Sequence, residues 1–335
     1  MLTLLSPMIH YTSWLVKCRG CGEKRILESM QEAIKESKTA ESVKSHENIE
    51  AKKELLLNAL NWFVRGRIAQ TPLDRLFVLD AFRMLGEDIP EQEKIIQELN
   101  AIQSDEGTWK KGHEHYVPTT AQALLFYKRI GATPEKSLEP FLATIDTWEK
   151  AVAHNDRYQL GNRWGGLWGY VGCYTALGQR PPWADKFLEE ARERFDEWAQ
   201  DNHQRSHVID CFRQLGEPIP RTEELVALTL QGQMPDGRWQ TAGHWNPALP
   251  QTAFGIATLK ILQPQGSPET NEAINRGLEF IDQCYKITRW KEKEYGGYCQ
   301  ELNTPFQVQD PLATSLAIIA QLHPEQLEEL TGYDE

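Results

Sequence analysis

Apolar residues recur at helical spacing along most of the chain and divide it into helices of two alternating kinds. The less charged kind is predicted near residues 73–86, 118–131, 165–178, 203–216, 250–263 and 310–322. The other kind has an apolar stripe beside a charged face, and it is predicted near residues 52–65, 90–103, 134–152, 182–200, 221–233 and 269–286. Because a charged helix face meets solvent, we expect the first kind on the inside and the second kind on the outside.

The inner helices end on a glycine that follows an apolar residue, as in Leu85-Gly86, Ile130-Gly131, Leu177-Gly178 and Leu215-Gly216. Glycine just past an apolar helical run is a typical helix stop, because it readily adopts the left-handed backbone of the C-terminal cap. These stops recur every 38 to 47 residues. Each unit of the chain is therefore predicted to be a helical hairpin.

The hairpins also resemble one another in sequence. At an offset of 130 residues, the segment 79–87 (LDAFRMLGE) matches the segment 209–217 (IDCFRQLGE), and the segment 105–109 matches the segment 235–239. Self-similarity at a fixed offset is the signature of a repeat architecture.

Six inner and six outer helices predict an all-α fold, a closed (α/α)6 toroid, in which closure buries the first hairpin against the last. We expect the toroid over residues 51–335 and an N-terminal arm or helix over residues 1–50.

Composition and charge narrow the function classes. The 335 residues are 40% hydrophobic and 25% charged, which is typical of a globular protein. The formal net charge is −12 and the basic residues are scattered, which argues against a nucleic-acid partner. No apolar run is long enough to span a membrane, and Met1 to Val16 lacks the features of a secretory signal, so we expect a cytoplasmic protein. Peripheral contact with a membrane and the oligomeric state are left open.

The six cysteines are too few and too dispersed for a disulfide scaffold, so reduced thiols are expected. Cys18 and Cys21 have the spacing of half a zinc site, but no second pair follows at a suitable distance. We expect neither a metal nor a cofactor.

Four loops rich in glycine and aromatic residues precede inner helices: Gln103 to Trp109, Arg163 to Trp168, Gln233 to Trp239, and Tyr295 to Tyr298. Glycine permits the sharp turn from outer to inner helix, an aromatic ring packs over the turn, and glutamine ties neighbouring backbone. We expect the four loops at one end of the toroid, and we expect their main role to be stabilising the fold.

Two of these loops read Gln, three residues, then Gly-x-Trp. This pattern resembles the prenyltransferase and squalene-cyclase repeat superfamily, and the resemblance covers about 270 residues of the chain. It implies an α-helical toroid that handles an isoprenoid. Toroids of this superfamily cyclise isoprenoids, transfer prenyl groups to proteins, or serve as non-catalytic binding domains.

The resemblance also implies where an acid would stand. Class II terpene cyclases protonate their substrate with an aspartate of an Asp-x-Asp-Asp-Thr-Ala motif at the start of an inner helix. Thr120-Ala121 and Thr252-Ala253 keep the end of that motif but lack the acids, and Asp310 is the one acid left in register. Asp310 precedes Pro311, so an ordinary helix cap is the alternative to a catalytic acid.

Further candidates lie at the expected rim, where the N-termini of inner helices converge and favour an anion. The candidate catalytic residues are Asp310, His113 and His203. The candidate substrate-binding residues are Trp109, Tyr116, Arg163, Trp164, Trp168, His244, Trp245 and Tyr295.

Three further motifs bear on metal-dependent prenyl transfer, diphosphate ionisation and sugar chemistry. Asp282-Gln283-Cys284 has the spelling of a zinc prenyltransferase motif, but its repeat position is on an outer helix. The chain has no Asp-Asp-x-x-Asp motif for magnesium-dependent ionisation of a diphosphate. Asp80 and Asp210 stand at equivalent positions with an arginine three residues later, which suits either a structural pair or acid-base chemistry on a sugar.

The leading expectation is a terpene-cyclase-like enzyme, a lyase or isomerase, that binds an isoprenoid in a central aromatic cavity and starts cyclisation by protonation. A carbohydrate-active (α/α)6 lyase or hydrolase and a non-catalytic binding toroid are the alternatives.

Overall fold

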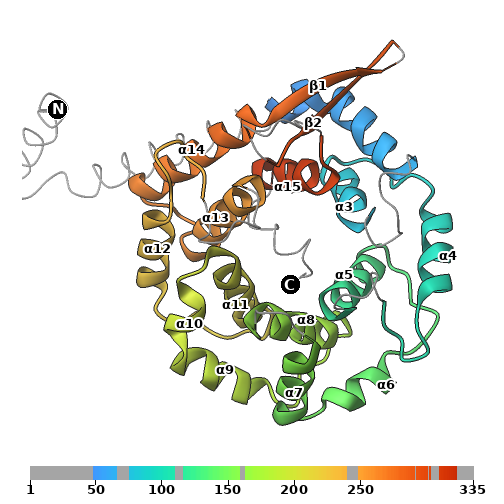
Figure 1. The fold of residues 1–335 in the computed structure, drawn as a ribbon, viewed down its shortest axis with the longest axis vertical. Helices are drawn as coiled ribbons and strands as arrows, with labels where there is room; N and C mark the ends of the chain where they lie inside the picture. The colour runs from blue at the N-terminus through green and yellow to red at the C-terminus, as the bar shows by residue number, and fades with distance from the viewer. Residues whose placement is uncertain are drawn as a thin grey trace, which may run out of the picture. The chain divides into compact units, whose positions relative to one another are not determined.

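The structure is a computed structural model, which describes residues 48–65, 75–109, 116–158, 163–239, 248–290, 292–300, 302 and 309–322. The chain divides into two units, Met1–Glu50 and Ala51–Glu335. All labelled helices and strands belong to the second unit, which is predominantly helical and carries one two-stranded sheet (Figure 1).

The less charged helices of the second unit occupy the places that the hydrophobic pattern predicts. They are α3 (Leu76–Met84), α5 (Tyr116–Arg129), α8 (Arg163–Ala176), α11 (Asn202–Gln214), α13 (Ala248–Leu262) and α15 (Pro311–Leu322). They lie on the inner side of the unit (Figure 1). Consecutive members pack against each other from α3 to α15, and α15 packs against α3.

The more charged helices lie outside them (Figure 1). They are a helix over residues 51–65, α4 (Gln92–Ile102), α6 (Glu139–Leu142), α7 (Trp148–Tyr158), α9 (Ala184–Glu193), α10 (Phe195–Ala199), α12 (Thr222–Gln231) and α14 (Pro268–Gln283). In α9, Phe187, Leu188 and Ala191 are buried, whereas Lys186 and Glu189 pair on the exposed side. The core therefore fills the space between the two helix layers, as the amphipathic pattern requires.

Glycine ends the inner helices as expected. Gly86 has a φ of 71°, its N–H donates to the Arg83 carbonyl, and the next N–H, of Glu87, donates to the Phe82 carbonyl. This is the glycine C-terminal cap in which left-handed backbone satisfies the last helical carbonyls.

Two outer segments differ from the prediction. The single helix expected near 182–200 is divided into α9 and α10. The single helix expected near 134–152 is instead α6, a 3-10 turn η2 (Ala143–Ile145) and α7. Pro140 stands in the first turn of α6, where its missing N–H costs nothing, so the helix begins there rather than at residue 134.

The last loop also differs, because it belongs to an antiparallel hairpin. Strand β1 (Tyr285–Trp290) pairs with β2 (Lys293–Tyr298), from Tyr285 opposite Tyr298 to Trp290 opposite Lys293. Aromatic and β-branched residues favour strands, and β1 contains several of them. Because this segment is short and directly follows a helical pattern, the sequence did not predict it as a strand. Among the described helices, none is long and apolar enough to cross a membrane.

Candidate functional site

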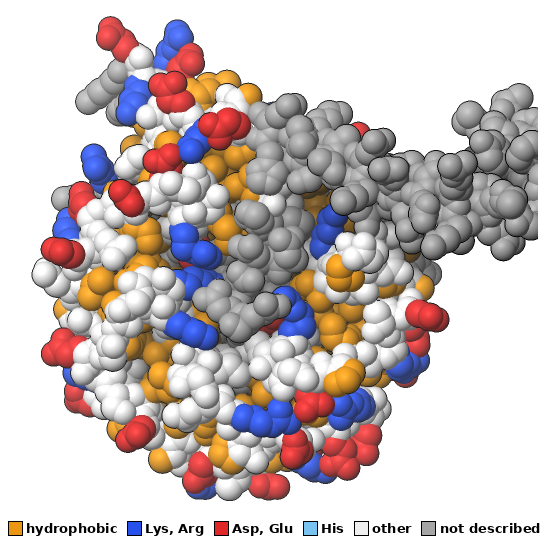
Figure 2. Space-filling model, turned by 180° about the vertical axis from the view of Figure 1, so that it is seen from behind, with side chains coloured by type: hydrophobic (Ala, Val, Ile, Leu, Met, Phe, Trp, Pro, Cys, Tyr) orange, Lys and Arg blue, Asp and Glu red, His pale blue; other side chains and the backbone are white. Residues whose placement is uncertain are grey.

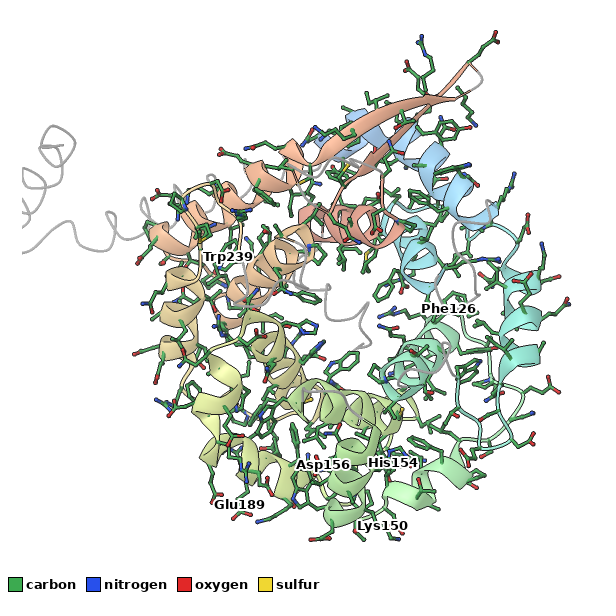
Figure 3. The ribbon with its side chains drawn as sticks, in the orientation of Figure 1. Phe126, Lys150, His154, Asp156, Glu189 and Trp239 are labelled. Atoms are coloured by element: carbon green, nitrogen blue, oxygen red, sulfur yellow. The ribbon has the colours of Figure 1, made fainter. Side chains whose placement is uncertain are left out.

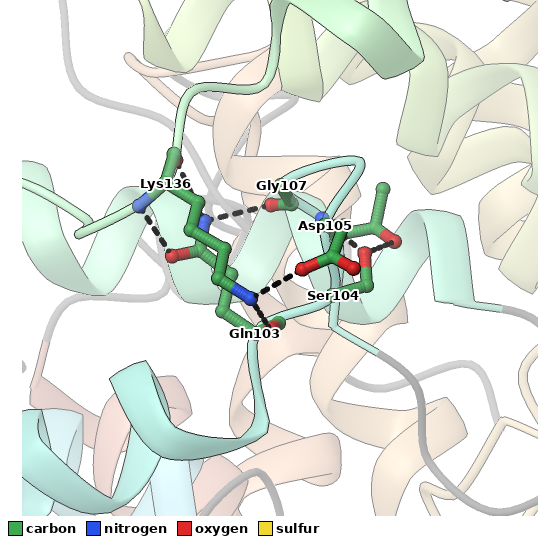
Figure 4. Close-up of polar contacts among 6 residues, drawn as sticks. Gln103, Ser104, Asp105, Gly107 and Lys136 are labelled. Carbon is green, nitrogen blue, oxygen red and sulfur yellow. Dashed lines mark hydrogen bonds and ion pairs between the residues drawn. The ribbon is translucent and has the colours of Figure 1, made fainter.

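The Gln-x3-Gly-x-Trp loops are turns held by the glutamine. The Gln103 amide donates to the Gly107 carbonyl at 2.9 Å and to the Lys136 carbonyl at 2.8 Å, and its oxygen accepts from the Lys136 N–H at 2.8 Å (Figure 4). Gly107 has a φ of 84°, and a Cβ there would overlap the Ser137 carbonyl. The motif therefore joins an outer helix to the loop that opens the next hairpin.

The tryptophan of the motif is also structural. Trp109 is fully buried, its indole N–H donates to the Leu99 carbonyl at 2.9 Å, and its backbone N–H donates to the Thr120 hydroxyl at 3.0 Å. Thr120 belongs to the Thr-Ala pair at the start of an inner helix. The Thr-Ala pair thus serves the turn, and Trp109 is placed away from any surface that a substrate could reach.

The second turn repeats these contacts. Gln233 donates to the Gly237 carbonyl at 2.8 Å and to the Ala273 carbonyl at 2.7 Å, and Trp239 bonds the Thr252 hydroxyl and the Thr229 carbonyl. Trp239 lies beside α13 and α14 (Figure 3). Its ring occupies the space that a Cβ would need at Gly255 of α13 and Gly277 of α14.

A third copy of this arrangement escaped the sequence analysis, because its glutamine follows the glycines instead of preceding them. Gln309 donates to the carbonyls of Lys286 and Tyr295, both at 2.8 Å, and the Tyr298 N–H donates to the Thr314 hydroxyl at 2.9 Å. Tyr298 takes the place of the buried tryptophan.

Asp310 caps α15. Its Oδ1 accepts from the Ala313 N–H at 2.8 Å, and its own N–H donates to the Tyr298 carbonyl at 2.9 Å. A carboxylate bonded to the third helical N–H is the ordinary N-cap geometry. One of the two alternatives for Asp310, the helix cap, is therefore present in the structure.

Trp164 and Trp168 of α8 are both about 2% exposed, but their surroundings differ. Trp164 packs against Phe187 of the outer helix α9. Trp168 packs against His207 of α11, with ring centroids 4.6 Å apart, and its indole N–H donates to Asp210 at 3.3 Å. Trp168 therefore contacts a polar cluster between inner helices, whereas Trp164 belongs to the core between layers.

That cluster contains a histidine pair. His203 and His207 stand one helical turn apart on α11, and their Nε2 atoms are 3.0 Å apart. One ring donates a hydrogen bond to the other, because neutral imidazole has one donor and one acceptor nitrogen. Phe254 of α13 closes the other side, 5.5 Å from His203 and 6.1 Å from His207 between ring centroids.

Burial sets the charge of the pair. Burial lowers the pKa of His203, and the nearby Asp201 offsets part of this shift. Burial lowers the pKa of His207 well below the ordinary value of 6.5, and the neighbouring His203 lowers it further. Both rings are therefore neutral near pH 7, because a low-dielectric site disfavours imidazolium.

Three buried polar atoms at the α11–α13 junction have no hydrogen-bond partner: His207 Nδ1, Asn202 Oδ1 and Gln251 Oε1. Their side chains are at least nine-tenths buried. Asn202 also joins the two helices, since its amide donates to the Gln251 carbonyl at 2.9 Å. Sequence reasoning named His203 but missed His207, although the spacing of four residues on an inner helix was a usable signal.

The two repeat-related aspartates are buried and held by donors. Asp80 of α3 pairs with Arg129 of α5 at 2.6 Å, and Asp210 of α11 accepts from Trp168 and, at 2.9 Å, from Gln214. The arginines three residues later stand farther off, at 3.7 Å for Arg83 and 3.9 Å for Arg213. These contacts are those of structural carboxylates.

The remaining candidates are dispersed. Tyr295 is on β2 beside Trp62, with ring centroids 6.1 Å apart. Tyr116 and Arg163 begin α5 and α8, and their side chains are outside the description. Also outside the described residues are His113, His244, Trp245, Cys18 and Cys21.

Within the described part of the chain, no three His, Cys, Asp or Glu side chains form a group that could hold a metal ion. Asp282 of the zinc-like motif instead pairs with Lys52 at 3.0 Å, and Cys284 follows the end of α14. The chain matches no protein-family model, and no curated protein matches its sequence.

Proposed function

We propose that residues 51–335 form an (α/α)6 toroid that binds an isoprenoid against its inner helices, and that the His203–His207 pair is its proton-accepting group. The observation that carries the proposal is this neutral histidine pair, enclosed by the aromatic rings of Trp168 and Phe254.

The toroid rests on the contacts of the inner helices. Each packs against the next, and the return contact of α15 with α3 completes the series. The turns at Gln103 and Gln233 support it further, because in both the glutamine amide donates to the carbonyl of the glycine four residues later.

The chemistry follows from the neutral state of the pair. When a carbocation forms beside a base, a neighbouring C–H bond breaks, the proton goes to the basic nitrogen and the electron pair becomes a new alkene. Where His207 Nε2 donates to His203, His207 Nδ1 carries a free lone pair and has no other partner. Aromatic faces stabilise a nearby cation, so Trp168 and Phe254 suit a carbocation at this place.

The class of substrate comes from the resemblance of the Gln-x3-Gly-x-Trp turns to those of isoprenoid-handling toroids. Asp310 is the other candidate for proton transfer, as an acid that starts the reaction. Its contact with Ala313 uses Oδ1, so the two roles are separable by substitution.

The test is product formation. The full chain is incubated with farnesyl diphosphate, geranylgeranyl diphosphate and squalene, and extracts are analysed by gas chromatography with mass spectrometry. We expect product from the wild type, loss of product in His207→Gln, and retention in Asp310→Asn, which keeps the cap because asparagine caps helices as well as aspartate. Product loss in Asp310→Asn with an unchanged melting temperature would assign the proton chemistry to Asp310 instead.

A second candidate, a non-catalytic isoprenoid-binding toroid, is favoured by the engagement of Asp80, Asp210 and Asp310 in structural contacts. It predicts quenching of tryptophan fluorescence by the same isoprenoids without any product. Absence of both quenching and product would overturn the isoprenoid proposal in either form. Among the described residues, no contact favours the carbohydrate alternative over these two.

A further inference from the structure

The junction of α3 and α5 holds two guanidinium groups against one carboxylate. Arg129 Nη1 donates to Asp80 Oδ2 at 2.6 Å, and Arg83 Nε lies 3.7 Å from Asp80 Oδ1. The side chains of Arg129 and Asp80 are 3% and 5% exposed. Among the described residues, two guanidinium groups therefore face the Asp80 carboxylate, and the side chain of Arg83, which is 36% exposed, leaves the site open to solvent.

The guanidinium groups also have unused donors. Nε and Nη2 of Arg83 and the same two atoms of Arg129 are buried and have no hydrogen-bond partner. A buried charge without its hydrogen bonds is costly. These donors thus call for an acceptor that Asp80 alone does not supply.

The nearby helix ends do not supply it. Both arginines are in the last turn of their helix, where a cation is favoured by the helix dipole. The carbonyls of Phe82 and Arg83 in α3, and of Tyr127 and Lys128 in α5, already accept from the backbone N–H groups that follow each helix. The dipole explains the sign of the charge but gives the free N–H groups no partner.

The repeat copy provides an internal comparison. Asp210 is the counterpart of Asp80. It accepts from the uncharged Trp168 and Gln214, and Arg213 Nη1 lies 3.9 Å from its carboxylate. Arg129 stands nine residues after Thr120, and nine residues after Thr252 the chain has Ile261. The arginine of α5 is therefore not repeated at the corresponding position of α13.

We propose that Arg83 and Arg129 form an oxyanion-binding site, oriented by Asp80, for the phosphate or diphosphate group of a ligand. Guanidinium presents parallel N–H groups that match the oxygens of phosphate, and a fork of two arginines reads a diphosphate better than a point charge does. Figure 2 shows Lys and Arg side chains around the middle of one face, while many of the Asp and Glu side chains lie toward its periphery. Basic side chains that gather on one face favour an anion there although the net charge of the chain is −12.

The experiment is calorimetric titration of the full chain with inorganic pyrophosphate, inorganic phosphate and acetate. The proposal predicts binding of pyrophosphate that weakens as salt is raised. Arg83→Gln should weaken it by about tenfold, and Arg129→Lys, which keeps the charge and loses the fork, by a similar factor. Arg213→Gln is the matched control at the repeat copy and should leave the affinity unchanged.

The outcomes separate the sources of the oxyanion. Tighter binding of acetate than of either phosphate ion would replace the phosphate assignment with a carboxylate ligand. No heat with any of the three anions, or an equal loss of affinity in Arg83→Gln and Arg213→Gln, would overturn the site. Circular dichroism of each variant verifies that it is folded. The site does not depend on the proposed isoprenoid function, because the probes contain no isoprenoid.

Discussion

Replacing Gln103 by leucine tests whether the hydrogen bonds of this glutamine are the main stabilising contacts of the Gln-x3-Gly-x-Trp turn. Leucine is similar in size but removes the bonds to the Gly107 carbonyl, the Lys136 carbonyl and the Lys136 N–H. Each such bond contributes about 1 kcal/mol net. The free energy of unfolding should therefore fall by about 3 kcal/mol, with the Gly107 carbonyl left buried and unbonded as the largest part.

Gln233→Leu is the matched control in the second turn. There the glutamine bonds two backbone carbonyls, of Gly237 and Ala273, and its third contact is with the exposed Arg276. Because an exposed contact contributes little, we expect a loss of about 2 kcal/mol.

Urea unfolding followed by tryptophan fluorescence measures both variants against the wild type. The expected order is wild type, then Gln233→Leu, then Gln103→Leu. A loss below about 1 kcal/mol for Gln103→Leu, or a larger loss for Gln233→Leu, would refute the reasoning that the number of backbone bonds sets the strength of each turn.

Three further outcomes are expected. Gly107→Ala should lower the free energy of unfolding by about 3 kcal/mol or more, because the added Cβ would overlap backbone atoms of Ser137 and Leu138. Gly86→Ala should lower it by about 1 kcal/mol, because nothing lies within 4 Å of the added Cβ. Equal losses in urea unfolding would contradict this explanation. Burial lowers the pKa of His203 and His207 below 6.5, so the unfolded chain binds more protons below about pH 6.5. Their contribution to stability is complete above that pH and is lost as pH falls toward the folded pKa values, by up to about 1.4 kcal/mol per pH unit for each ring. Urea unfolding at pH 7.5 and 5.5 should show a smaller drop in His207→Gln than in the wild type, and an equal drop would exclude the pair as its source. Asp310→Ala should lower the free energy of unfolding by about 1 kcal/mol and Asp310→Asn by much less, while an equal loss in both would argue against capping.

The helices were the most predictable part of the fold. Their periodicity and their glycine stops are local properties. The end of α3 at Gly86 is made by the bond of Gly86 N–H to the Arg83 carbonyl and that of Glu87 N–H to the Phe82 carbonyl. The cap at Asp310 is local for the same reason, because it reaches only to Ala313. The hairpin after α14 was missed, since a strand pair depends on a partner that a helical window does not include.

The candidate site was less predictable. Sequence position placed Trp109 and Trp168 in the same class, yet Trp109 lies inside a turn and Trp168 touches the histidine pair. The neighbours of a side chain depend on how its helix is rotated against the helices around it. The residues next to it in the sequence do not determine that rotation.

The sequence by itself therefore determined the inner helices, their order, the repeat and the two Gln-x3-Gly-x-Trp turns, because helix periodicity, glycine stops and turn motifs are read from residues within a few positions. The tertiary structure decided what meets between helices: the Arg129 contact with Asp80 across 49 residues and the contact of Trp168 with Asp210 across 42. Burial then decided the chemistry, since it is the loss of water around His207 that keeps the ring neutral.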